Sequence, residues 1–111
     1  MVNDSSALFN QFKIYFDAFL QESTPGGERY PAAKAKINEA ISKGVLVYNY
    51  LGHGGPSGLA QERVLLKDDV RTWENLDKLP IIITATCSFT GFDDPGIVSA
   101  GEEAILNPNG G

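Results

Sequence analysis

The fold is decided by Val45-Leu46-Val47-Tyr48-Asn49-Tyr50-Leu51 and by Ile81-Ile82-Ile83-Thr84-Ala85-Thr86. Both runs are short and rich in β-branched or aromatic residues, which predicts strands. The first run alternates poorly and the second is apolar throughout, as in a sheet that is covered on both faces. A third strand is predicted over residues 13–19, which are also rich in aromatic and branched side chains.

Helical patterns alternate with these strands. Pro31 suits the first turn of a helix, where its missing N–H costs nothing, and Gly44 suits the position just after a helix. The apolar residues between them fall at helical spacing: Ala33, Ile37, Ala40 and Ile41. This alternation of strands and helices predicts an α/β fold in which helices flank a parallel sheet.

Two shorter helices are predicted further along the chain. Asp68 can cap the first of them and Ser99 the second, which continues to residue 106. The apolar residues of the first are Val70, Trp73 and Leu76. A short helix is also predicted over residues 5–12, and the Pro-Gly-Gly sequence within residues 24–28 predicts a turn.

The composition excludes several classes of function. The 111 residues include 9 basic and 14 acidic side chains, for a net charge of −5, without a Lys/Arg cluster, so a nucleic-acid partner is not expected. A single Cys and a single His allow neither an internal disulfide nor a four-ligand zinc site, and we expect no metal or cofactor. No apolar run reaches the ~20 residues of a membrane span, and the N-terminus lacks a signal-peptide pattern.

The single histidine and the single cysteine each follow a predicted strand directly. His53 comes after the strand that ends at Leu51, and Cys87 after the strand that ends at Thr86. Reactive groups gather at the carboxyl ends of parallel strands, so the two side chains would emerge together if the strands are neighbours. A histidine beside a cysteine can take its proton and produce a thiolate nucleophile. The backbone N–H groups of Gly54 and Cys87 are then candidate oxyanion donors.

Each of these residues also has an ordinary structural explanation. A free cysteine after an apolar strand is often an inert core thiol, and a histidine among glycines is often a turn residue. The alternative function is therefore a non-catalytic α/β binding or assembly module with a buried Cys87. The acidic pair Asp93-Asp94 could hold a hard cation, but it lacks calcium-loop spacing and suits a solvated turn.

Two segments resemble the gingipain-type cysteine peptidases. The histidine segment is Val47-Tyr48-Asn49-Tyr50-Leu51-Gly52-His53-Gly54-Gly55-Pro56-Ser57-Gly58, followed by Ala60-Gln61-Glu62-Arg63. The cysteine segment is Leu79-Pro80-Ile81-Ile82-Ile83-Thr84-Ala85-Thr86-Cys87-Ser88-Phe89. The order and spacing of the two segments and their position after strands carry the resemblance.

Three further segments are similar to the C-terminal sortases of the type IX secretion system of Bacteroidetes. They are Ser23-Thr24-Pro25-Gly26-Gly27-Glu28-Arg29-Tyr30-Pro31, Phe92-Asp93-Asp94-Pro95, and Ser99-Ala100-Gly101-Glu102-Glu103-Ala104 with Leu106-Asn107-Pro108. Together with the histidine and cysteine segments, they extend the resemblance from about residue 13 to the end of the chain.

The resemblance implies a caspase-like fold in which Cys87 is the nucleophile and His53 the general acid/base, with oxyanion contacts from Gly54 and Cys87. It implies an endopeptidase that removes C-terminal sorting domains from secreted proteins and transfers the remaining cargo, held as the acyl-enzyme, to a lipopolysaccharide amine. The partners would be those protein substrates and other type IX components. The expected location is the cell surface, on the outer membrane.

The resemblance also implies that residues 1–111 are a part of such a domain, truncated at both ends. Related proteins carry two acidic residues before the matched region, one assisting the histidine and one setting specificity, and a further core strand after it. Within this chain Asp17 and Glu103 are the carboxylates that could approach the site, although each suits a structural role. The isolated chain is expected to have little or no peptidase activity and to self-associate through exposed strand edges.

Overall fold

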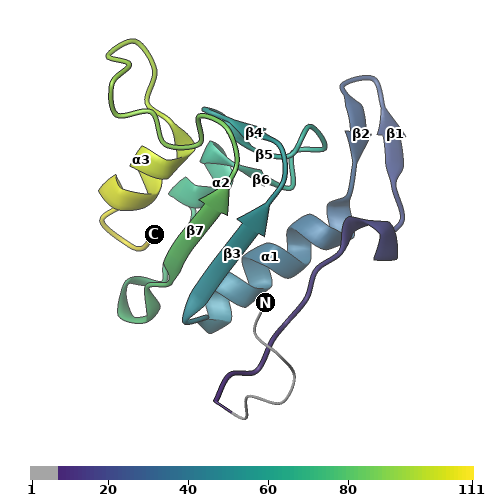
Figure 1. The fold of residues 1–111 in the computed structure, drawn as a ribbon, viewed down its shortest axis with the longest axis horizontal. Coiled ribbons are helices and arrows are strands. Elements are labelled where there is room, and N and C mark those ends of the chain that lie inside the picture. Colours follow the sequence, from purple (N-terminus) through teal and green to yellow (C-terminus); the bar gives the residue numbers. More distant parts are fainter. Residues whose placement is uncertain (1–7) are drawn as a thin grey trace.

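The two apolar runs form a parallel pair of strands, as predicted. The computed structural model describes residues 8–111, in which β3 (Val47–Leu51) pairs with β7 (Ile81–Ala85). The register sets Val47 opposite Ile81 and Leu51 opposite Ala85. Both strands point the same way, so the segments that leave them lie at one end of the sheet (Figure 1). The prediction of an α/β fold with a parallel sheet and flanking helices is confirmed.

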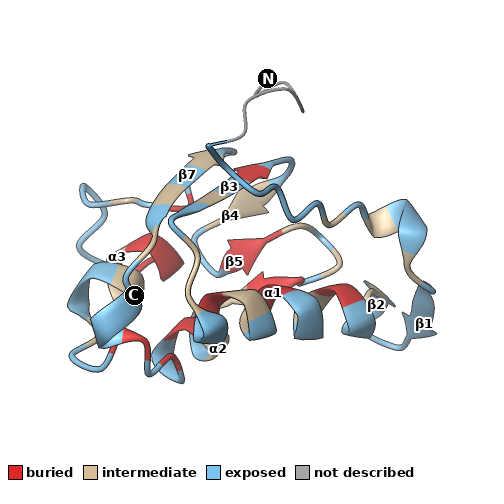
Figure 2. Cartoon of the chain, turned by 90° about the horizontal axis from the view of Figure 1, so that it is seen from below, coloured by how far each residue is buried: buried red, intermediate tan, exposed pale blue. Residues whose placement is uncertain are grey.

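Three α-helices lie on the same side of this sheet (Figure 2). They are α1 (Pro31–Lys43), α2 (Lys67–Arg71) and α3 (Ala100–Leu106). The first begins and ends as predicted: Gly44 follows it with φ 93°, and its N–H donates to the carbonyls of Ala40 and Ile41. No helix within residues 8–111 is long and apolar enough to cross a membrane.

The two predicted caps had different outcomes. Ser99 caps α3: its hydroxyl accepts from the Glu102 N–H, while the Glu102 carboxylate accepts from the Ser99 N–H at 2.7 Å. The prediction for Asp68 is wrong, because Leu66 precedes α2 and the carboxylate of Asp69 accepts its N–H at 2.8 Å. Asp69 has the advantage of a second partner, the Lys34 ammonium at 2.9 Å.

The N-terminal predictions are largely wrong. Residues 13–19 form no strand but contain the short 3₁₀ helix η1 (Phe16–Ala18), because the Phe16 ring stacks on Tyr30 with ring centroids 5.5 Å apart. Of the helix predicted over residues 5–12, residues 5–7 lie outside the described part and residues 8–12 are not helical. The predicted turn at residues 24–28 joins β1 (Glu22–Thr24) to β2 (Gly27–Arg29).

A small antiparallel sheet follows β3 immediately and packs beside the helices. It consists of β4 (Gly54–Gly55), β5 (Gly58–Leu59) and β6 (Leu65–Leu66), and a second 3₁₀ helix, η2 (Leu76–Lys78), precedes β7. The apolar side chains of the β4–β5–β6 sheet complete the core between the β3–β7 sheet and the helices. The buried cluster contains Ile37, Ile41, Tyr50, Leu59, Val64, Leu65, Val70, Trp73, Phe89 and Ala100. Of the three apolar residues predicted for one helix, only Val70 lies in α2, Trp73 follows its end, and Leu76 lies in η2 and is 60% exposed.

The β3–β7 sheet is covered on one face only, within the described residues. Tyr48, Tyr50, Ile82 and Thr84 alternate inward toward the helices, and the intervening side chains are exposed. The exposed face, here called the bare face, is formed by Val47, Asn49, Leu51, Ile81, Ile83 and Ala85. The expectation of a sheet covered on both faces is therefore wrong for residues 8–111. The short apolar runs did not reveal this because both faces carry aliphatic side chains.

The stability of this sheet is expected to fall in alkaline solution. Burial raises the pKa of Tyr48 far above its ordinary value, with a further rise from nearby Tyr50, and burial also raises the pKa of Tyr50. A raised pKa in the folded state means that stability is complete below the unfolded pKa of about 10 and is lost progressively above it. Urea titrations at increasing pH should show this loss, and Tyr48→Phe should make it shallower. An unchanged slope in Tyr48→Phe would contradict the assignment.

Candidate functional site

His53 and Cys87 occupy matching positions at the carboxyl end of the parallel pair. Each lies two residues beyond the last register pair, Leu51 opposite Ala85. The pairing continues for one more residue, because the Gly52 N–H donates to the Ala85 carbonyl at 3.2 Å. Adjacent strands lie about 4.8 Å apart, so the two segments leave the sheet side by side. Both residues are exposed, as a substrate would require.

The backbone at His53 is held by two hydrogen bonds. The Tyr50 hydroxyl donates to the His53 carbonyl at 2.7 Å, and the Ala60 N–H donates to the same oxygen at 2.7 Å. Tyr50 is buried in the core, 8% exposed, so the first of these bonds ties His53 to a fixed part of the fold. The imidazole stays exposed while its main chain is fixed, which suits a group that must exchange protons with a substrate.

The Gly54 N–H points away from the strand with which Gly54 pairs. The bond from Ala60 to the His53 carbonyl makes His53 and Ala60 a hydrogen-bonded pair of the β4–β5 hairpin. Hydrogen-bonded and non-bonded pairs alternate along antiparallel strands, so Gly54 and Leu59 form a non-bonded pair. This orientation leaves the Gly54 N–H available for a group outside the hairpin, consistent with its predicted role as an oxyanion donor.

Cys87 is not a core thiol. It is free and exposed, which removes burial as the explanation for a cysteine at this position. Its N–H has no acceptor among residues 8–111. The next residue, Ser88, has φ 48°, in the left-handed region that residues other than glycine rarely adopt. The chain therefore turns just after the exposed Cys87.

Thr86 is a feature of this site that the sequence analysis missed. Its hydroxyl oxygen is buried and finds no hydrogen-bond partner within the described part of the chain. It lies against the main chain of Gly54, where an added Cβ would be 2.5 Å from the Thr86 hydroxyl oxygen. The two segments that carry His53 and Cys87 therefore touch through Thr86 and Gly54. The glycine directly after His53 was the one sequence feature that could have indicated a close contact at this position.

Of the carboxylates considered from the sequence, Glu103 and Asp94 have other partners and Asp17 lies in a 3₁₀ helix. The Glu103 carboxylate binds the Arg71 guanidinium at 2.5 Å, which lowers the pKa of Glu103 and ties α3 to α2. Asp17 lies in η1, the 3₁₀ helix that packs beside Tyr30. The Asp94 carboxylate accepts the Gly96 N–H at 2.9 Å, which fits a solvated turn.

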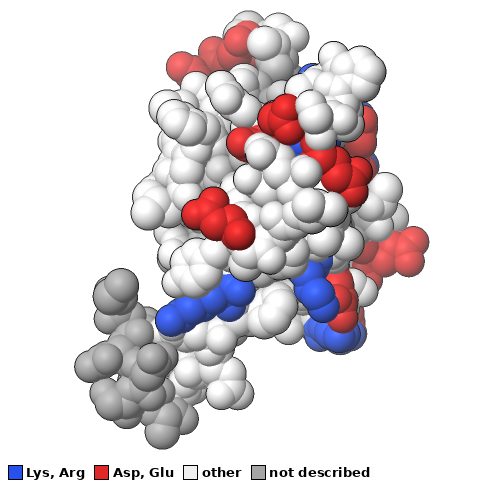
Figure 3. Space-filling model, turned by 90° about the vertical axis from the view of Figure 1, so that its right-hand side faces the viewer, with Lys and Arg blue, Asp and Glu red and all other residues white. Residues whose placement is uncertain are grey.

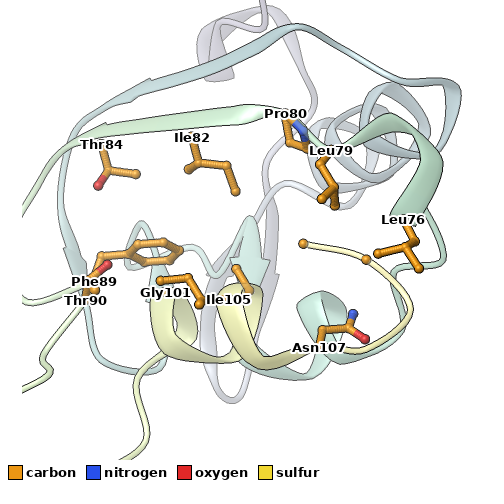
Figure 4. A pocket seen from close by; sticks show the side chains of 13 residues that line it. Leu76, Leu79, Pro80, Ile82, Thr84, Phe89, Thr90, Gly101, Ile105 and Asn107 are labelled. Atoms are coloured by element: carbon orange, nitrogen blue, oxygen red, sulfur yellow. The ribbon is translucent and has the colours of Figure 1, made fainter.

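A separate apolar pocket lies between β7 and α3. Figure 4 shows Ile82 and Thr84 facing Phe89, Gly101 and Ile105 across it. Its volume is about 440 Å³, and its lining contains neither His53 nor Cys87 and no ionisable side chain. The pocket therefore offers apolar contacts and no acid–base chemistry. On the face drawn in Figure 3, basic side chains form no continuous patch.

Comparison with known proteins identifies a family for the whole chain. The sequence profile of peptidase family C25 matches residues 1–111. No match was found among curated proteins or among solved structures. The family match covers both strand-end segments, and so includes the positions of His53 and Cys87.

Proposed function

The chain belongs to peptidase family C25, the gingipain family, and we propose that His53 and Cys87 are the catalytic dyad of this cysteine peptidase domain. The observation that carries the proposal is their matching position, each two residues beyond the last register pair of β3 and β7. Both side chains are exposed at that end of the sheet. The family match supports the reaction class, and the parallel register of β3 and β7 supports the proposed pairing of the two reactive groups.

The proposed reaction is acyl transfer through a thioester. His53 takes the proton from the Cys87 thiol, and the resulting thiolate attacks the carbonyl carbon of the scissile peptide bond. Backbone N–H groups of Gly54 and Cys87 stabilise the oxyanion that forms. His53 then returns the proton to the leaving amine as the C–N bond breaks. Water or another amine attacks the thioester, giving hydrolysis or a new peptide bond, and restores the thiol.

We further propose the substrate class and location of the type IX C-terminal sortases. Support comes from the segments around residues 23–31, 92–95 and 99–108, which resemble those proteins beyond the histidine and cysteine segments. Substrates would then be secreted proteins with a C-terminal sorting domain, and the acceptor a lipopolysaccharide amine. Other components of the type IX system would be partners, and the protein would act at the cell surface, on the outer membrane.

Intact-mass measurement of a cargo protein tests this proposal. The full-length protein, incubated with cargo that carries a C-terminal sorting domain, should release that domain. With an added amine, the remaining cargo should gain the mass of the amine in place of water. The Cys87→Ala variant should leave the cargo intact. If an unrelated peptide is cleaved while the cargo remains whole, the peptidase assignment stands and the sortase assignment is wrong.

We also propose that the isolated 111-residue chain self-associates through the bare face. Its four large aliphatic side chains are between 45% and 82% exposed: Val47, Leu51, Ile81 and Ile83. Neither β3 nor β7 contains a charged residue that would oppose contact with a second copy. Apolar area removed from water contributes roughly 25 cal/mol per Å², and this burial would drive contact between two bare faces.

Light scattering should therefore detect dimers or larger species of the chain. Ile83→Lys places a charge on the bare face and should shift the population toward monomer. Leu106→Lys, on an exposed part of α3, is the matched control and should leave the population unchanged. A chain that is monomeric at every concentration tested would show that the bare face does not mediate association.

A further inference from the structure

The side chain of Thr86 occupies the space that a side chain at position 54 would need. A Cβ added to Gly54 would lie 2.5 Å from Oγ1 of Thr86 and 3.2 Å from its Cγ2. Both branches of the threonine therefore press against the main chain of Gly54. Thr86 directly precedes Cys87, and Gly54 directly follows His53. The contact thus joins the two segments that carry the reactive side chains.

The backbone at position 54 does not itself demand glycine. Gly54 is a residue of β4 and is not among the glycines in the left-handed region, unlike Gly27 and Gly44. The steric reason for a glycine here is the volume of Thr86, because the next contact of an added Cβ is the Gly58 carbonyl oxygen at 3.3 Å. Gly54 lacks a side chain, and the Thr86 side chain fills the space that this leaves, which is here called the notch.

The Thr86 hydroxyl acts here by its shape and not by a hydrogen bond. The oxygen is buried and has no partner within residues 8–111. A buried hydroxyl without a partner is unfavourable and calls for an explanation in a native fold. A β-branched side chain has a restricted χ1 angle, so its two branches hold a fixed position between neighbouring segments.

We propose that Thr86 is a positioning residue, which sets the separation of the His53 and Cys87 segments by filling the notch at Gly54. The inference rests on the proposed dyad, since the separation matters only if His53 activates Cys87. Threonine and valine have nearly the same shape, so Thr86→Val should preserve the separation. Thr86→Ala removes both branches and should let the two segments move relative to each other.

The test measures how strongly alkylation of Cys87 depends on His53. Cys87 is the only cysteine of the chain, so iodoacetamide reports on this thiol alone. For each protein, the His53 effect is defined as its alkylation rate at pH 6.5 divided by the alkylation rate of the same protein carrying His53→Ala in addition. It is compared for the unmodified chain, Thr86→Val, Thr86→Ala, Gly54→Ala and the double variant Thr86→Ala/Gly54→Ala. Circular dichroism verifies that each variant is folded.

We expect the His53 effect to be about tenfold or more in the unmodified chain and within about twofold of that in Thr86→Val. It should fall by at least about fivefold in Thr86→Ala and in Gly54→Ala. The double variant should recover much of the effect, because the added Cβ refills the notch from the opposite side. If Thr86→Ala or Gly54→Ala does not fold, the His53 effect in Thr86→Val and in the double variant still tests whether the shape of the Thr86 side chain sets the separation.

Different failures have different meanings. A His53 effect near one in the unmodified chain overturns the dyad, and the positioning role with it. A large His53 effect that Thr86→Ala leaves unchanged overturns the positioning role alone. A loss in Thr86→Val as large as in Thr86→Ala also overturns it, because the hydroxyl and not the side-chain shape would then be responsible.

Discussion

Replacement of Cys87 by alanine is expected to abolish peptide cleavage by the protein. The thiolate supplies the bond to the substrate carbonyl, and Cys87 is the only cysteine among the 111 residues. Loss of a catalytic nucleophile lowers kcat by a factor on the order of 10⁴ to 10⁶. His53→Ala should cause a loss of similar size, because a nucleophile and its base act as a unit. The double variant should therefore be hardly slower than either single one.

Steady-state kinetics with a fluorogenic peptide measure this effect. kcat should fall while KM changes little, since neither side chain is needed to bind the peptide. Ser42→Ala, at an exposed position of α1, is the control and should keep full activity. If Cys87→Ala retains turnover within about tenfold of the unmodified protein, Cys87 is not the nucleophile.

Replacement of Trp73 by alanine is expected to cause a very large loss of stability. Trp73 is 5% exposed, lies in the buried cluster between the sheet and the helices, and donates from Nε1 to the Asn38 side-chain oxygen at 3.0 Å. Removal of a buried aromatic side chain typically costs about 3–5 kcal/mol of unfolding free energy. Small domains have only about 5–15 kcal/mol in total. The variant should therefore lose a large share of the stability of the fold.

Urea denaturation followed by circular dichroism tests this, because Trp73 is the only tryptophan and the variant lacks its fluorescence. Trp73→Phe keeps an aromatic ring and should lose less stability. Leu76→Ala is the matched control, since Leu76 is 60% exposed and should cost less than about 1 kcal/mol. A loss in Leu76→Ala equal to that in Trp73→Ala would contradict the burial seen in the structure.

The strands β3 and β7 and the helix α1 could be predicted from sequence, because each has a strong local signal. The strands are short apolar runs between turns, and α1 has a Pro at its start, a Gly at its end and periodic apolar residues. The same strand-end pattern located His53 and Cys87 before their register was known. Local sequence patterns were sufficient to predict these elements because neighbouring residues determine where each of them begins and ends.

The remaining features depend on contacts between distant parts of the chain. The aromatic residues around Phe16 were predicted to form a strand, but stacking on Tyr30 is a tertiary contact that no local pattern shows. Leu66 and not Asp68 precedes α2, and the Asp69 carboxylate that accepts the Leu66 N–H also pairs with Lys34, which is far away in sequence. The contact of Thr86 with Gly54 depends likewise on the register of β3 and β7, which the sequence alone did not give.

The rate at which iodoacetamide alkylates Cys87, with and without His53, tests the central claim most directly. The measurement needs no substrate and reports on the only thiol of the chain. If His53 accepts the proton of Cys87, alkylation at pH 6–7 should be fast and should slow by about tenfold or more in folded His53→Ala. Equal and slow rates in the two proteins would contradict the dyad and leave Cys87 as an exposed but unactivated thiol.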